Sequence, residues 1–182
     1  MGSKIIPWLY VFSLSSLLTF SAAAQTVINW KTTEGWSVYY SPEGSLTTCA
    51  TSRDFPGDDR LIISIAPKAA NFSLVISNNR WKSLQHQRRY TLEIRFDGLV
   101  TSGNAVALNQ DGYAGLGLGL NQKGLAVFAA ANVMTVFYDG SEVVRLPLVG
   151  TGAAVRELEN CQRAVNPAGW PGGGARSDPF RR

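Results

Sequence analysis

The side chains that most often perform catalysis or bind metals are few in this chain. Its 182 residues include one histidine, His86, and two cysteines, Cys49 and Cys161. A single imidazole excludes the usual zinc hydrolase arrangements, which need two or three histidine ligands. A Ser-His-Asp triad would have to use His86, but this residue lies in a polar, cationic segment and no Gly-x-Ser-x-Gly motif accompanies it. We predict a solvated His86 and no catalytic residue, and an enzyme centred on His86 is the third hypothesis.

Carboxylates and glycines offer two further kinds of site. Asp54, Asp58 and Asp59 could hold a hard cation or form an acid-base pair, but their spacing does not fit a calcium loop and is typical of an exposed turn. The glycine-rich residues 115–119 lack the third glycine of a dinucleotide fingerprint and the Gly-Lys-Ser/Thr ending of a phosphate loop. We therefore expect no metal site and no cofactor.

Cations and aromatic side chains alternate in one segment and indicate a possible binding surface. Its members are Arg80, Trp81, Lys82, His86, Arg88, Arg89 and Tyr90. Such side chains stack on sugars or bases and bind phosphates or carboxylates, so contact with a polyanion or a glycan is one hypothesis. The alternative is that Trp81 belongs to the core and its cationic neighbours are solvated. The high average burial of large aromatic residues favours this alternative.

Residues 1–24 have the three parts of a secretory signal peptide. Lys4 is their only charge, an apolar stretch follows it, and the small residues Ala22 to Ala24 precede Gln25. We predict cleavage after Ala24. A retained membrane anchor is the alternative, but the apolar run is short, contains serines and lacks a basic stop-transfer flank.

Removal of 24 residues and one lysine changes the net charge from +4 to +3 and leaves 158 residues. A charge this small does not indicate nucleic acid as a partner. No further segment approaches the length of a transmembrane helix, so we predict a mature form that does not span a membrane and is periplasmic or secreted. Export would oxidise Cys49 and Cys161 to a disulfide. Two reactive free thiols are the alternative, but neither cysteine lies in a Cys-x-x-Cys motif.

The elements that must position these residues are mainly strands. Patterning and turn residues predict strands within residues 35–40, 47–51, 61–65, 72–77, 91–96, 105–107, 115–120, 133–138 and 142–148. The sequence Asp139-Gly140 predicts a two-residue hairpin. Gly115, Gly117 and Gly119 alternate with leucines, which leaves one strand face without side chains and allows another segment to lie close against it.

Two helices complete the prediction. An alanine-rich apolar run within residues 123–132 indicates a buried helix, and residues 152–165 carry the apolar stripe Ala154, Leu158, Cys161 and Val165. A Cys49–Cys161 bridge would fasten this last helix to the sheet. We predict an α+β fold with a mainly antiparallel sheet, either sandwich-like or strongly curved, in a single domain of residues 25–165. Residues 166–182 are rich in proline and glycine and predict a flexible tail.

Several segments resemble small exported domains of alphaproteobacteria that form an uncharacterised family. The resemblance rests on the leader, the two cysteines, Trp36 to Tyr39, Asn79 to Trp81, Phe96 to Gly98, and residues 146–154. Similar segments occur alone or attached to secreted peptidase-like regions. The resemblance implies a fold and a compartment, and it transfers no catalytic residue.

These observations favour a non-catalytic binding or accessory protein that acts through a protein surface. Its partner would be an envelope or extracellular protein. A sharper alternative is an inhibitor of a secreted hydrolase, since small disulfide-linked domains suit that role.

Overall fold

A computed structural model describes residues 26–43, 46–65, 72–110 and 112–166. The predicted leader, residues 67–70 between two strands, and all but the first residue of the predicted tail lie outside the described residues. Ten strands are present in the described part: β1 Ile28–Thr33, β2 Trp36–Glu43, β3 Leu46–Asp54, β4 Asp59–Ile65, β5 Phe72–Asn78, β6 Arg89–Phe96, β7 Leu99–Gln110, β8 Tyr113–Leu120, β9 Val133–Tyr138 and β10 Ser141–Pro147. Two helices accompany them: α1 Gln122–Ala130 and α2 Thr151–Val165.

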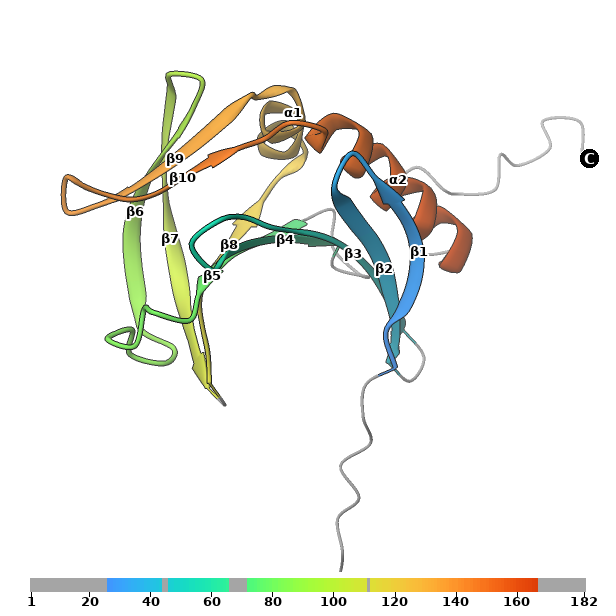
Figure 1. Ribbon diagram of the computed structural model, residues 1–182, viewed down its shortest axis with the longest axis horizontal. Helices are drawn as coiled ribbons and strands as arrows, with labels where there is room; N and C mark the ends of the chain where they lie inside the picture. The colour runs from blue at the N-terminus through green and yellow to red at the C-terminus, as the bar shows by residue number, and fades with distance from the viewer. Residues whose placement is uncertain (1–25, 44–45, 66–71, 111, 167–182) are drawn as a thin grey trace, which may run out of the picture.

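The strands form one antiparallel sheet rather than the two sheets of a sandwich. Their order is β1-β2-β3-β4-β5-β8-β7-β6-β9-β10. Figure 1 shows this sheet bent into an arch, with α1 near its top and α2 beside β1, β2 and β3. The predicted α+β fold, with a strongly curved sheet, an internal helix and a C-terminal helix, is confirmed. Strand β1 was not predicted, because its apolar alternation is limited to Ile28 and Trp30; its side chains from Ile28 to Thr32 are all exposed.

The core lies between the helix side of the sheet and the two helices. On β6 the alternate residues Leu92, Ile94 and Phe96 are buried, as the sequence alternation predicted. An edge-to-face chain of rings crosses this core, because Trp36 packs on Phe128 and Phe128 on Phe96 at centroid distances of 6.4 and 6.2 Å. The aromatic chain joins β2, α1 and β6 across the width of the arch.

Two turns have the backbone that their residue types predict. In the β9–β10 turn, Asp139 and Gly140 have φ angles of 50° and 73°, both in the left-handed region that a two-residue hairpin needs. In the β6–β7 turn, Asp97 and Gly98 have φ angles of 47° and 93°. Asp97 tolerates this conformation because aspartate visits the left-handed region more readily than bulkier residues do.

The glycine face of β8 is close to another segment at one end only. A Cβ atom on Gly115 would lie 3.0 Å from the carbonyl oxygen of Ile76, whereas a Cβ atom on Gly119 would meet nothing within 4 Å. The prediction of a closely approaching segment therefore holds at Gly115 and fails at Gly119. This difference marks the end of β8 as the more open part of the strand.

Candidate functional site: a groove where the sheet divides

The predicted cation and aromatic surface lies on the loop between β5 and β6 and on the start of β6. Trp81 is half-buried and packs against the hydrophobic core, while Lys82 and Arg89 are exposed. The Arg88 guanidinium lies 5.5 Å from the centre of the Tyr90 ring. These positions place part of Trp81 in the core, in agreement with the alternative interpretation, and the four cations Arg80, Lys82, Arg88 and Arg89 are exposed.

Neighbouring elements divide the rest of this surface. Arg80 turns toward the β3–β4 turn, where its Nη2 donates a hydrogen bond to the Gly57 carbonyl. Tyr90 packs edge-to-face on Tyr138 of β9, with ring centroids 5.5 Å apart. The structure therefore brings Arg88 and Tyr90 together and directs Arg80 away from them.

His86 is exposed, and its Nδ1 accepts a hydrogen bond from the backbone N–H of Asn109 at 3.2 Å. Within the described residues, no serine or carboxylate is hydrogen-bonded to its ring. The predicted absence of catalysis stays a prediction, and His86 has a neighbour that positions its ring rather than one that would activate it.

The three aspartates near the β3–β4 turn have separate partners. Asp54 accepts a hydrogen bond from Arg60, with 3.0 Å between Nη2 and Oδ2, and this bond is the main cause that lowers the pKa of Asp54. Asp59 accepts from the Asn78 amide at 2.6 Å. Among the described residues, no group of three or more potential ligands is close enough to hold a metal ion.

The sheet divides between β7 and β8. These strands pair from Gln110 and Tyr113, next to their turn, as far as Val106 and Gly117. Beyond that point β7 continues to pair with β6 as far as Leu99, and β8 continues to pair with β5 as far as Leu120. Figure 1 shows the two strands meeting at the lower tip and separating upward, with α1 above the separation. The seven residues 99–105 of β7 therefore pair with β6 alone.

The N–H and C=O groups of successive residues in β7 point alternately toward β6 and toward β8, so one known hydrogen bond shows which of them face the separation. The N–H of Ala107 donates to the Arg88 carbonyl and its own carbonyl accepts from Gln87, both at 2.8 Å, so Ala107 faces the β6 side. Alternate residues of a strand direct their N–H and C=O groups to opposite edges. Because the β6–β7 register continues without a shift, Val100 and Ser102 direct their backbone groups toward β8.

An apolar groove of about 290 Å³ lies at this separation, and we call it the split groove. Its apolar walls come from β6, β7, β8 and α1: Ile94, Phe96, Leu99, Leu118, Leu120 and Val127. Leu99 is 56 % exposed, an unusually high value for a leucine beside a hydrophobic cavity. Polar groups are few, and they include Ser102 of β7 and Lys123 of α1. Such a lining suits an apolar ligand oriented by a small number of polar contacts.

Asp97 fixes one end of this groove. Its Oδ2 accepts hydrogen bonds from the Asn132 backbone and side chain at 2.8 and 3.0 Å, and its Oδ1 accepts from the Val133 backbone at 2.8 Å. The hydrogen bond from the Asn132 backbone is the main cause that lowers the pKa of Asp97. The carboxylate thus ties the β6–β7 turn to the segment between α1 and β9.

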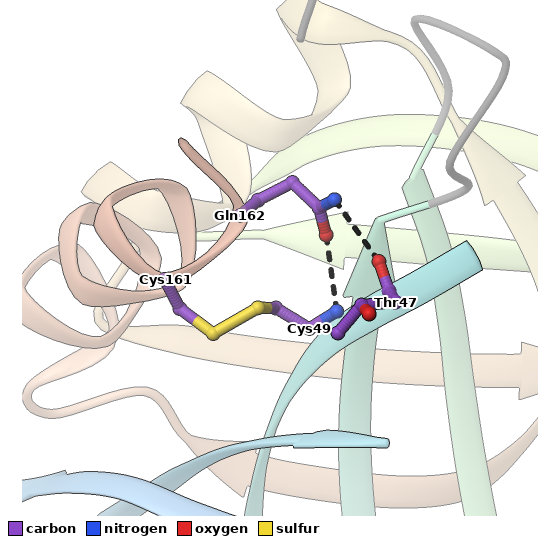
Figure 2. Close-up of a disulfide and its surroundings, with 4 residues drawn as sticks. All are labelled: Thr47, Cys49, Cys161 and Gln162. Atoms are coloured by element: carbon purple, nitrogen blue, oxygen red, sulfur yellow. Dashed lines mark hydrogen bonds between the residues drawn. A yellow bond between two sulfur atoms is a disulfide. The ribbon is translucent and has the colours of Figure 1, made fainter. Parts of the chain in front are cut away.

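Cys49 and Cys161 form the predicted disulfide, which joins β3 to α2. Beside it the Gln162 side chain, almost fully buried, accepts a hydrogen bond from the Cys49 N–H at 3.0 Å and donates one to the Thr47 carbonyl at 3.2 Å. Figure 2 shows the disulfide and both hydrogen bonds between the helix and the strand. Here β3 has passed its last pairing with β4, at Ala50, so the Gln162 amide occupies the place of a strand neighbour.

Sequence reasoning missed the split groove. Its residues come from four elements. The only related pattern that was recognised in the sequence was the alternation of glycine with leucine within residues 115–120. Gly119 and Gly124 both line the groove, and Leu118 and Leu120 form part of its wall. The residue at which β7 and β8 separate depends on how many residues pair between these strands, and no local sequence pattern specifies that number.

This curved antiparallel sheet with two helices on one side is a known fold. It is similar to the crystal structure of invasion associated protein B from Bartonella henselae, with a TM-score of 0.56 and 11% sequence identity. The matched region covers 74% of this chain and 97% of that chain. No protein-family model matches the chain, and no curated protein is similar to it in sequence. The likeness therefore concerns the fold.

Proposed function

We propose that this chain is exported and acts as a non-catalytic binding or accessory protein, with an envelope or extracellular protein as its partner. The observation that carries this proposal is the split groove, an apolar surface that neighbouring strands leave open. Exposed apolar grooves with few polar groups are typical of sites that bind other molecules.

The disulfide supports export, and the structural neighbour supports an accessory role. The Cys49–Cys161 bridge suits an oxidising compartment, because cytosolic thiols are kept reduced. Among the described residues, no helix has the length and apolar character needed to cross a membrane. The structural neighbour is described as an invasion associated protein, a description that is compatible with an accessory role.

Substitution at Gly124 tests the groove without removing a contact. A Cβ atom at this position would lie 3.4 Å from Leu120 Cδ2, an ordinary contact, so Gly124→Ala should fit and Gly124→Leu should fill the groove. We expect purified wild-type protein and Gly124→Ala to retain a stoichiometric partner from an envelope extract, and Gly124→Leu to lose it. Equal retention by all three proteins would assign binding to another surface.

The same experiment separates the remaining functional hypotheses. If the retained partner is a hydrolase whose activity falls on binding, the chain is an inhibitor. Mass spectrometry of the protein recovered from the producing cells should find an N-terminus at Gln25. An intact leader in cytoplasmic protein would contradict export.

A further inference from the structure

We propose that the split groove binds an extended, apolar peptide segment of a partner protein, which pairs with β7 as an additional strand. This inference rests on the proposed function and specifies the chemistry of its partner. It depends on the free edge of β7, the lining of the groove and the charge at its α1 end.

The free edge of β7 is the main support. Val100 and Ser102 direct their N–H and C=O groups into the separation between β7 and β8, where the described structure provides no strand neighbour. A row of unpaired backbone groups is the surface to which an extended peptide adds in strand-addition complexes. The space lies where a strand between β7 and β8 would be.

The two outer edges of the sheet differ from this inner edge. Strand β1 has a bulge before Lys31, and β10 has a bulge after Glu142 and ends at Pro147. Bulges, charges and proline are the devices by which edge strands avoid pairing with other chains. The inner edge of β7 differs because its ladder to β6 has no bulge, and it begins with Leu99 and Val100, each 56 % exposed. The chain therefore protects its outer edges and leaves the inner edge open for pairing.

The groove lining selects apolar side chains at alternate positions of the added strand. Successive residues of a strand point to opposite faces, so every second side chain of the peptide would point into the groove. There it would meet Phe96 of β6 and Val127 of α1. A volume of about 290 Å³ is near the lower limit of ligand pockets, which favours a few small apolar side chains such as valine.

The charge of Lys123 favours an acidic residue at one end of the peptide. Lys123, at the start of α1, is exposed, and among the described residues it is the only charged one that lines the groove. An acidic side chain at the α1 end of the peptide would therefore be attracted, and a basic one would be repelled. The effect on affinity should be modest, about two- to fivefold, because both charges would remain in contact with water.

Binding can be measured with two fluorescent, end-blocked octapeptides in which valine alternates with threonine. One peptide carries aspartate at its end and the other carries lysine. We expect the mature protein to bind both by fluorescence anisotropy, with a preference for aspartate that Lys123→Gln removes. In the complex, the Ser102 amide should become slower to exchange with solvent.

Three variants distinguish strand addition from general apolar adsorption. Ser102→Pro removes an N–H that faces the groove and leaves the ladder to β6 intact, so it should weaken peptide binding about tenfold. Ser102→Ala is its matched control: it removes the same hydroxyl group but keeps the backbone N–H, so it should bind the peptides about tenfold more tightly than Ser102→Pro does. Gly124→Leu should abolish binding, and because leucine favours a helix more than glycine does, the protein should remain folded.

The outcomes are distinguishable from those that test the proposed function. If neither peptide binds, or if Ser102→Pro binds as tightly as Ser102→Ala, strand addition is wrong. Binding of laurate but not of either peptide would also overturn it and indicate a ligand with an acyl chain. Capture of a partner from the envelope that depends on Gly124 would then still support the proposed function, because that result requires the groove but not an added strand.

Discussion

Two strands of this sheet, β3 and β7, extend beyond their pairing with a neighbour, and their unpaired edges have different surroundings. Strand β3 continues past its last pairing with the described part of β4, at Ala50, and there the strand edge is taken up by the Gln162 side chain and covered by α2. Beyond Val106, β7 leaves β8, and α1 lies beside the separation without an equivalent polar side chain toward Ser102. The first separation is closed, and the second contains the split groove.

The two strand edges differ in how their backbone N–H and C=O groups find hydrogen-bond partners. A buried backbone group without a hydrogen-bond partner costs about 1–3 kcal/mol, so the closed separation needs an acceptor for Cys49 and a donor for Thr47. Water can reach the open separation and satisfy the same kinds of group there. An open edge can therefore be maintained at little cost in stability and remains available to a partner.

The largest effect should come from the covalent connection at the closed separation. The disulfide closes a span of 112 residues, for which the chain-entropy estimate is roughly 5 kcal/mol. We expect the double variant Cys49→Ser, Cys161→Ser to lose about 2–5 kcal/mol in urea unfolding, the usual range for native disulfides. An unchanged free energy of unfolding would show that α2 packing alone closes this region.

The next effect concerns the amide beside the disulfide. Gln162→Met keeps the length of the side chain but leaves Cys49 N–H and the Thr47 carbonyl without partners, so we expect a loss of about 1–3 kcal/mol for each unpaired group. Gln162→Glu should also be harmful at neutral pH, because it would bury a carboxylate with one oxygen against the Thr47 carbonyl, and its loss should shrink at acidic pH, where a protonated carboxyl group can both donate and accept. Equal stability of the Met variant and the wild type would contradict a role for Gln162 as a strand neighbour.

Features that depend on local sequence patterns were predicted, and features that depend on the arrangement of the whole sheet were not. The apolar stripe of α2 and the two cysteines are local patterns, and together they predicted which helix lies on which part of the sheet. Gln162 was not predicted, because a glutamine beside an apolar stripe does not reveal that it faces a strand edge. Its role depends on where β4 ends, a property of the whole sheet.

The candidate site was predicted less well than the fold. The cation and aromatic segment at residues 80–90 was chosen because its residues are close in sequence, and the structure separates Arg80 from Arg88 and Tyr90. The split groove combines residues from 94 to 127, none of which has unusual chemistry. A site made of ordinary apolar side chains and unpaired backbone leaves almost no signal in a single sequence.

Hydrogen exchange compares the two separations directly. We expect the Cys49 amide to be strongly protected, because its N–H is bonded to a buried side chain. The Ser102 amide should exchange within about tenfold of the unprotected rate, whereas Gly103, which faces β6 in the same strand, should be slow. Similar protection at residues 102 and 103 would mean that the open separation is closed in solution.

The smallest effect should appear at the turn that borders the groove. Asp97 has a pKa below its usual 3.8 because it accepts hydrogen bonds from the Asn132 backbone, the Val133 backbone and the Asn132 side chain. A lowered pKa contributes stability that is complete above pH 3.8 and is lost as the pH falls through the folded-state value.

The variant Asp97→Asn should therefore melt at a lower temperature than the wild type at pH 7, and the difference should shrink as the pH falls below 3.8. Asp139→Asn is a matched control, since Asp139 is also a left-handed turn residue, with a φ angle of 50° against 47° for Asp97. If the difference between Asp97→Asn and the wild type is the same at pH 7 and pH 3, the carboxylate charge does not hold this turn. The rigidity of the open separation would then come from the β6–β7 ladder, and its width would not respond to acid.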